Sequence, residues 1–227
     1  MPENKNMPSL TVENYLKTIY RLSVQEPEGV TTNTLAAALG IKPATVTDML
    51  RKLSASKLVK HEKYYGVTLT EKGRRAALEI IRKHRLWEVF LAQKLQFTWD
   101  EVHEIAEQLE HVQSEELIDR LDKFLGYPKT DPHGDPIPDK NGRMSIHEFR
   151  PLAALQAGQS GAVSGVLEHS PAFLQYLEKN GLGLGNEVEV IEVHAFDQSA
   201  DIRLNRKKII HLSYDVTKNI LVKQHGK

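Results

Sequence analysis

The chain of 227 residues has no cysteine, no net charge (30 Lys and Arg against 30 Asp and Glu) and no long apolar run. Without cysteine it can form neither disulfides nor thiolate zinc sites, so any bound metal must be held by nitrogen and oxygen ligands. Its apolar runs are too short to cross a bilayer, and its first ten residues lack the apolar core of a secretory signal. We therefore expect a cytoplasmic protein with no membrane partner.

The zero net charge conceals an asymmetry along the chain. Residues 1–75 carry 12 Lys and Arg against 7 Asp and Glu, whereas residues 76–127 carry 6 against 11. A basic front end joined to an acidic middle suggests a part that binds a polyanion and a part that binds cations. Chance variation in surface charge would give the same pattern, so other signals must decide.

The front end reads as a helix-turn-helix. Apolar periodicity predicts a helix over 10–23. Thr31 or Thr32 can cap a short second helix that Gly40 ends, and Pro43 stands in the first turn of a third helix. An ordinary helical hairpin would look the same, so this pattern alone leaves the question of DNA binding open.

The next segment favours a winged helix-turn-helix. Residues 58–62 and 67–70 read as two strands around a turn, which places a hairpin directly after the third helix. Short polar side chains on that helix, and basic or aromatic ones on the hairpin, are suited to contact a DNA groove and its phosphates. The tyrosines of the hairpin could instead pack on the core. The candidate DNA-binding residues are Lys42, Ala44, Thr45, Thr47, Asp48, Arg51, Lys60, Lys63 and Tyr64.

Three further helices are predicted downstream. The first covers 71–95, the second starts from a capping box at 98–101, and Ser114 caps a third that Gly126 ends. In this third helix we expect Leu117, Leu121 and Phe124 to pack inward.

Histidines and carboxylates recur at helical spacing in these helices. His84 and Glu88 are one turn apart, and His103, Glu107, Glu110 and His111 would share one helical face. Glu107, Glu110 and His111 could bind one divalent ion, and His84, Glu88 and His103 a second. Such ligands suit manganese, ferrous iron, cobalt, nickel or zinc. The alternative without a metal is an exposed acidic helix whose histidines lie on the surface. The occurrence of all six residues together favours the metal site.

A metalloenzyme would use the same atoms. The sequence His103-Glu104-x-x-Glu107 approaches the zincin motif HExxH, but Glu107 replaces the second histidine. The sequence shows no separate nucleophile or general base nearby and no phosphate-binding glycine-rich loop. We therefore expect a protein that is not an enzyme.

The last third of the chain changes character. The segment 127–143 holds four prolines and two glycines, which predicts a linker or structured loop. Five short strands and one short helix follow and predict a small SH3-like β-barrel. The expected fold is mainly α with a small β part. Its parts are a winged helix-turn-helix (1–73), a helical dimerisation and metal-binding domain (74–140), a linker (141–150) and the SH3-like domain (151–227).

Several stretches together resemble the diphtheria toxin repressor family of iron- and manganese-dependent repressors. They are ENYLKTIYRL, KPATVTDMLRKL, LTEKGRRAA, RKHRLWEVFL, EVHEIAEQLEHVQSEELIDRL and PHGDPIP. The resemblance implies a homodimer that binds a divalent metal, then binds palindromic operator DNA and represses metal-uptake genes. The alternatives are a winged-helix regulator that senses a small organic ligand and a metallohydrolase with a nucleic-acid-binding module.

The resemblance also implies two ligand sets. The primary set corresponds to Asn14, Glu107, Glu110 and His111, and the ancillary set to His84, Glu88 and His103, with Glu168, His169, Asp131 and His133 as further candidates. Glu107 stands where the iron branch has cysteine and the manganese branch glutamate, which favours Mn²⁺, with Fe²⁺ second and Co²⁺, Ni²⁺ or Zn²⁺ as substitutes.

Two positions on the first helix depart from the family pattern. Asn14 stands where the family has methionine or aspartate, and Lys17 where some manganese sensors have a second acid. We expect a cation that joins Asn14 to the acidic cluster to fix the first helix against the helix-turn-helix.

Overall fold

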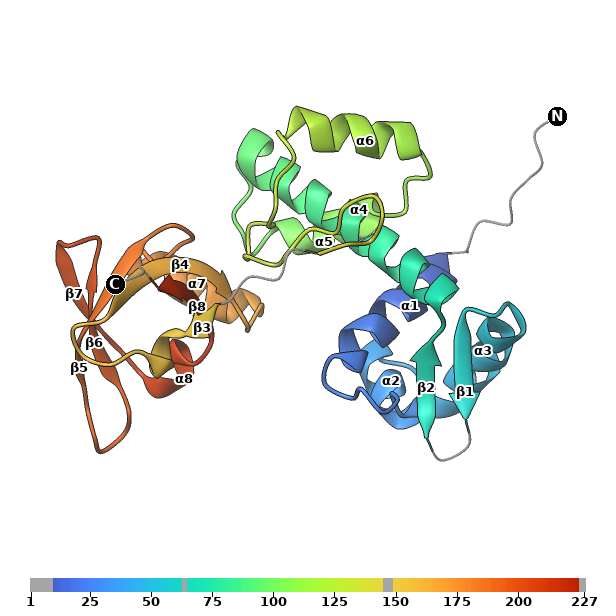
Figure 1. The fold of residues 1–227 in the computed structure, drawn as a ribbon, viewed down its shortest axis with the longest axis horizontal. Helices are drawn as coiled ribbons and strands as arrows, with labels where there is room; N and C mark the ends of the chain where they lie inside the picture. The colour runs from blue at the N-terminus through green and yellow to red at the C-terminus, as the bar shows by residue number, and fades with distance from the viewer. Residues whose placement is uncertain (1–9, 63–64, 145–148, 225–227) are drawn as a thin grey trace. The chain divides into compact units, whose positions relative to one another are not determined.

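A computed structural model describes residues 10–62, 65–144 and 149–224, and these residues form two compact units (Figure 1). The first unit contains residues up to 84 together with 109–113 and 138–143. The second contains 85–108, 114–137 and the chain from 144 onward. No helix among the described residues is long and apolar enough to cross a membrane.

The first unit is a winged helix-turn-helix. Its elements are α1 (Leu10–Ser23), α2 (Thr32–Leu39), α3 (Pro43–Ala55), β1 (Val59–Glu62), β2 (Gly66–Leu69) and the start of α4 (Glu71–Leu95). Thr31 caps α2 by accepting a hydrogen bond from the backbone N–H of Thr34, and Gly40 ends it in the left-handed conformation at φ 66°. The two strands pair antiparallel. The predicted order of elements is confirmed.

A single apolar core holds this unit together. Leu16 and Ile19 of α1 pack with Val46 and Leu50 of α3, and all four side chains are fully buried. The apolar stripe of α1 is therefore buried in the same core as the helix-turn-helix.

The helical middle differs from the prediction in two respects. α5 (Val102–Leu109) starts after a turn and stops early, so Glu110 and His111 lie just beyond its end rather than on its face. In α6 (Glu115–Phe124), which Ser114 caps as predicted, the inward residues are Ile118 and Leu121.

The predicted inward packing of Leu117 and Phe124 is wrong, because these side chains are 40% and 64% exposed. The physical reason is that the Ile118–Leu121 stripe already covers Leu86 and Val89 of α4.

The C-terminal part of the second unit is a small antiparallel sheet. Its strands are β3 (Arg150–Pro151), β4 (Ser160–Val166), β5 (Glu187–Val193), β6 (Ala200–Leu204), β7 (Lys208–Leu212) and β8 (Ile220–Gln224), in the order β3-β8-β4-β5-β6-β7 (Figure 1). A short 3₁₀ turn η1 (Leu152–Ala154) and the helices α7 (Pro171–Asn180) and α8 (Tyr214–Thr217) complete it. The predicted fold class, mainly helical with an SH3-like β part, is confirmed.

The proline-rich segment is a structured loop. The Asp131 carboxylate accepts hydrogen bonds from the backbone N–H groups of His133 and Asp135, and the His133 carbonyl accepts one from the Val166 N–H of β4 at 2.9 Å. Gly134 has a φ of 89°, and a Cβ there would lie 2.1 Å from the Ser164 carbonyl oxygen. Only glycine lets the loop approach β4 this closely.

Candidate metal centre

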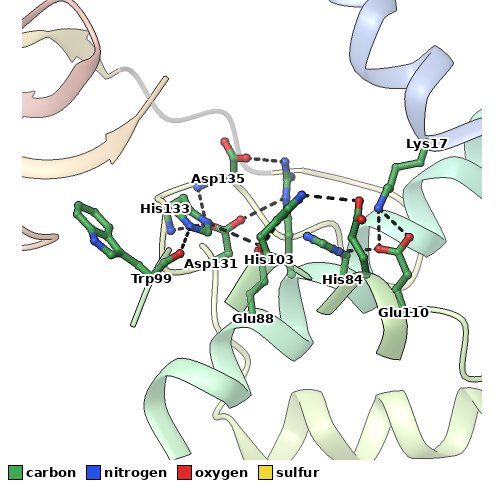
Figure 2. Close-up of polar contacts among 11 residues, drawn as sticks. Lys17, His84, Glu88, Trp99, His103, Glu110, Asp131, His133 and Asp135 are labelled. Atoms are coloured by element: carbon green, nitrogen blue, oxygen red, sulfur yellow. Dashed lines mark hydrogen bonds and ion pairs between the residues drawn. The ribbon is translucent and has the colours of Figure 1, made fainter. Parts of the chain in front are cut away.

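Glu110 is the central acid of the first unit. Its side chain is fully buried, and its two carboxylate oxygens lie 2.7 and 2.8 Å from the Lys17 ammonium of α1. One of those oxygens also lies 2.6 Å from His84 Nδ1 (Figure 2). A carboxylate just beyond the end of α5 is thus joined to the first helix of the DNA-binding domain.

The protonation state of Glu110 follows from these contacts. Burial by itself raises the pKa of this carboxyl. The hydrogen bond from His84 and the positive charge of Lys17 outweigh burial and lower the pKa below its usual value. Glu110 is therefore an ionised oxygen donor at neutral pH, the form that a divalent cation requires.

His111 makes a second contact with α1. Its Nδ1 lies 2.5 Å from Glu13 Oε2, and Glu13 Oε1 accepts a hydrogen bond from Gln113 Nε2 at 3.0 Å. Glu13 is 2% exposed, whereas its neighbour Asn14 is exposed, because successive helical residues point about 100° apart. The sequence pattern did not identify Glu13 as a candidate ligand, although Glu13 lies on the same face of α1 as Leu16 and Tyr20.

A second group of possible ligands lies within the second unit. Glu88 on α4 and Asp131 and His133 in the structured loop are 2%, 3% and 4% exposed. One ligand atom of each lies within 4.8 Å of the others, and Glu88 Oε1 is also 3.4 Å from His103 Nδ1 (Figure 2). Two buried carboxylates this close together are costly when both are ionised, so this grouping fits a metal.

The tautomer of His133 also fits a metal. Its Nε2 is 2.7 Å from the Trp99 carbonyl oxygen, which can only accept, so Nε2 carries the proton. Nδ1 then has a free lone pair and faces Glu88 and Asp131 at 3.8 and 4.0 Å. Metal-binding histidines commonly donate their other N–H to a carbonyl in this way.

Burial sets the charge of this second group. It lowers the pKa of His133, which favours the neutral ring. Burial, reinforced by the charge of Glu88, raises the pKa of Asp131 well above its usual range. Arg85 offsets part of that negative charge from 3.5 Å. A divalent cation would offset the remainder and hold Asp131 ionised.

The remaining predicted ligands are less enclosed. His103 and Glu107 are both more than half exposed, with His103 Nε2 3.7 Å from Glu107 Oε1. The ring of His169 lies 5.1 Å from that of His133, centroid to centroid. Glu168 is exposed and accepts a hydrogen bond from the Ser170 N–H at 2.7 Å. His84 is the exception, because it lies one turn before Glu88 on α4 and is 7% exposed.

The predicted DNA-binding residues lie mostly on the surface of the first unit. Thr47 is half-buried and donates its hydroxyl to the Pro43 carbonyl at 3.0 Å, while Arg51 pairs with Asp48 at 3.0 Å. Lys63 and Tyr64 lie outside the described residues. The exposed members are Lys42, Ala44, Thr45, Asp48, Arg51 and Lys60.

Comparison with known proteins accounts for these features together. Residues 7–67 match the iron-dependent repressor N-terminal DNA-binding domain, 70–139 its metal-binding and dimerisation domain, and 150–224 the FeoA domain. The chain is 41% identical to the iron-dependent repressor IdeR of Mycobacterium tuberculosis (strain ATCC 25618 / H37Rv) over 130 residues, 56% of this chain and 55% of that one. It is 32% identical to the regulator MntR of Geobacillus kaustophilus (strain HTA426) over 125 residues, 55% of this chain and 87% of that one.

A solved structure extends the match over almost the whole chain. A manganese-dependent transcriptional repressor in complex with manganese superposes with a TM-score of 0.83 at 35% identity, covering 94% of this chain and all of that one. The chain therefore belongs to the diphtheria toxin repressor family of metal-dependent transcriptional repressors.

Proposed function

We propose that this chain is a cytoplasmic repressor that binds Mn²⁺, with Fe²⁺ as the second choice, and then binds palindromic operator DNA as a homodimer to control metal-uptake genes. The observation that carries the proposal is the double contact between α1 and the segment 109–113. Glu110 meets Lys17 and His111 meets Glu13, so the candidate ligands contact the helix that packs beneath the helix-turn-helix.

The primary ligand set centres on Glu110 and His111, with Glu107 and Asn14 as its further members. Glu13 is an additional candidate, because it is buried and touches His111. Carboxylate and amide oxygens with a single imidazole suit Mn²⁺ better than zinc or copper, while Co²⁺, Ni²⁺ and Zn²⁺ can substitute.

The ancillary set centres on Glu88, which contacts both His103 and His133. Asp131 completes the buried part of this set. His84 lies one helical turn before Glu88 on α4, and the ring of His169 lies beside that of His133. Glu168 is included because of the family resemblance. This set offers four imidazoles and three carboxylates, a mixed donor set that suits manganese, iron, cobalt, nickel or zinc.

A bound cation would supply positive charge where α1 already touches the segment 109–113 and would hold the ligands of both segments in place. The chain's own residues determine the consequence. α1 shares its core with α3, so ordering α1 orders the recognition helix. Because the coupling is reciprocal, DNA should tighten metal binding by the same factor as metal tightens DNA binding.

A homodimer would place two α3 helices on successive major-groove faces about 34 Å apart or a multiple of it. The second unit carries exposed apolar side chains that a partner copy would cover, including Phe124 on α6 and Leu95 at the end of α4. We propose no catalytic role, since the relatives are named as repressors and regulators.

Mobility shifts test this function. The probe is a duplex selected from a random-sequence pool by the Mn²⁺-loaded protein, and each variant is measured with Mn²⁺ and with EDTA. We expect chelator to abolish binding by the wild type. Glu110→Gln should lose the response to Mn²⁺, while Glu104→Gln, an exposed acid on α5, should retain it.

His111→Ala gives a second reading in case Glu110→Gln unfolds. Binding by folded Glu110→Gln that stayed Mn²⁺-dependent and of wild-type affinity would contradict the primary site. Binding by the wild type that ignored both Mn²⁺ and EDTA would favour a regulator of another ligand.

A further inference from the structure

A row of polar side chains crosses the outer face of the C-terminal sheet. In the antiparallel register Glu192 of β5 stands opposite Asp201 of β6, and Asp201 stands opposite His211 of β7. The adjacent pair, Ala200 and Leu212, is buried in the core. Because side chains alternate between faces, the row points away from that core, on three neighbouring strands (Figure 1).

His194 joins this row from the hairpin that connects β5 and β6. Its backbone N–H donates to the Ser199 carbonyl at 2.8 Å, which fixes the turn. His194 Nε2 lies 3.5 Å from Asp201 Oδ2, and His211 Nδ1 lies 2.8 Å from Asp201 Oδ1. The two imidazole rings are 5.4 Å apart, so both flank one carboxylate.

We propose that His194, Asp201 and His211 form a binding site for a divalent cation of the zinc class, meaning Zn²⁺, Co²⁺, Ni²⁺ or Cu²⁺. One ligand atom of each residue lies within 4.8 Å of the others. Tetrahedral ligands about 2.0–2.1 Å from zinc are about 3.3 Å apart. Small side-chain rotations bridge this difference, because all three side chains are at least 31% exposed.

The donor set separates this site from the candidate ligands described above. It shares no residue with them, and it has two imidazoles for one carboxylate, whereas the primary set has three oxygen donors for one imidazole. Imidazole-rich sites prefer zinc, nickel and copper over manganese. Three protein ligands leave a fourth position for water.

The resting contacts prepare the ligands. The hydrogen bond from His211 lowers the pKa of Asp201, which keeps that ligand ionised. Without a cation, the three side chains form only an exposed pairing, and such pairings add little stability.

Counting bound zinc tests the proposal. The full-length protein is stripped with chelator, dialysed against excess Zn²⁺ and analysed by inductively coupled plasma mass spectrometry. We expect His211→Ala and Asp201→Asn to hold one zinc per chain fewer than the wild type. His61→Ala, which removes an exposed histidine from β1, should match the wild type.

Histidine-ring NMR of the wild type gives an independent reading. The ring resonances of His194 and His211 should shift on Zn²⁺ addition. An equal zinc count in the wild type and both variants, or unshifted rings at saturating Zn²⁺, would overturn the site.

The test of the zinc site can be separated from the test of the repressor function. His211→Ala should keep Mn²⁺-dependent DNA binding, and Glu110→Gln should keep the zinc at the sheet.

Discussion

Replacing Lys17 by methionine is the sharpest test of how the metal-free protein holds Glu110. The change removes an ammonium 2.7 Å from a fully buried carboxylate and keeps an unbranched side chain of similar length. His84 Nδ1 remains 2.6 Å and His111 Nε2 3.8 Å from the carboxylate oxygens of Glu110. The variant therefore asks how much of the stability of the first unit depends on neutralising this one acid.

The magnitude follows from Coulomb's law. At 2.7 Å the gross attraction is about 6 kcal/mol for an effective dielectric constant of 20. Desolvation of the two charges offsets much of that attraction, and removing one partner of a buried pair typically costs about 3–5 kcal/mol. Lys17 is 19% exposed and His84 still contacts the acid, so we expect about 3 kcal/mol. That corresponds to a fall in Tm of about 6–12 °C.

Thermal unfolding in EDTA measures the effect, and Lys52→Met, an exposed lysine on α3, is the control, with a change within about 0.5 kcal/mol. In a Glu110→Gln background the Lys17→Met penalty should shrink by more than half, because no buried charge is left. Saturating Mn²⁺ should also reduce the penalty if the cation binds Glu110. An unchanged Tm for Lys17→Met, or a penalty that is fully additive with Glu110→Gln, would refute the reasoning.

Three further changes probe other parts of the structure. Ser114→Ala removes the cap of α6 and should cost about 1 kcal/mol in urea unfolding; no loss would mean that the cap is replaced by water. Gly134→Ala adds backbone strain and also a clash with the Ser164 carbonyl oxygen. Gly158→Ala is the control, because it adds backbone strain of about 1–3 kcal/mol with no neighbouring atom to clash with. Gly134→Ala should therefore lower the free energy of unfolding clearly more than Gly158→Ala. Backbone N–H donation lowers the pKa of Asp139, so its ionised form stabilises the fold above about pH 4. The stability gap between wild type and Asp139→Asn, present at neutral pH, should therefore close as pH falls through that lowered pKa, and a gap that widened in acid would contradict this sign.

Local signals sufficed for the elements of the fold. Thr31 caps the start of α2 and Gly40 ends it. Pro43 opens α3 and Ser114 caps α6, each where the sequence predicts. These contacts join residues within a few positions, so the sequence displays both partners. Where packing against another element decides, as on the face of α6, the sequence alone misled: the stripe of Ile118 and Leu121 is buried instead of Phe124.

In the candidate site, too, local sequence determined one part and packing between distant segments determined the other. The sequence by itself determined the ligand types: no thiolate, and histidines and carboxylates concentrated in the middle of the chain. The tertiary structure decided the grouping, because Lys17 lies 93 residues from Glu110, and Glu13 lies 98 residues from His111. Spacing along one helix cannot show that Glu13, rather than the exposed Asn14, touches His111, since that depends on which side of α1 faces the segment 109–113.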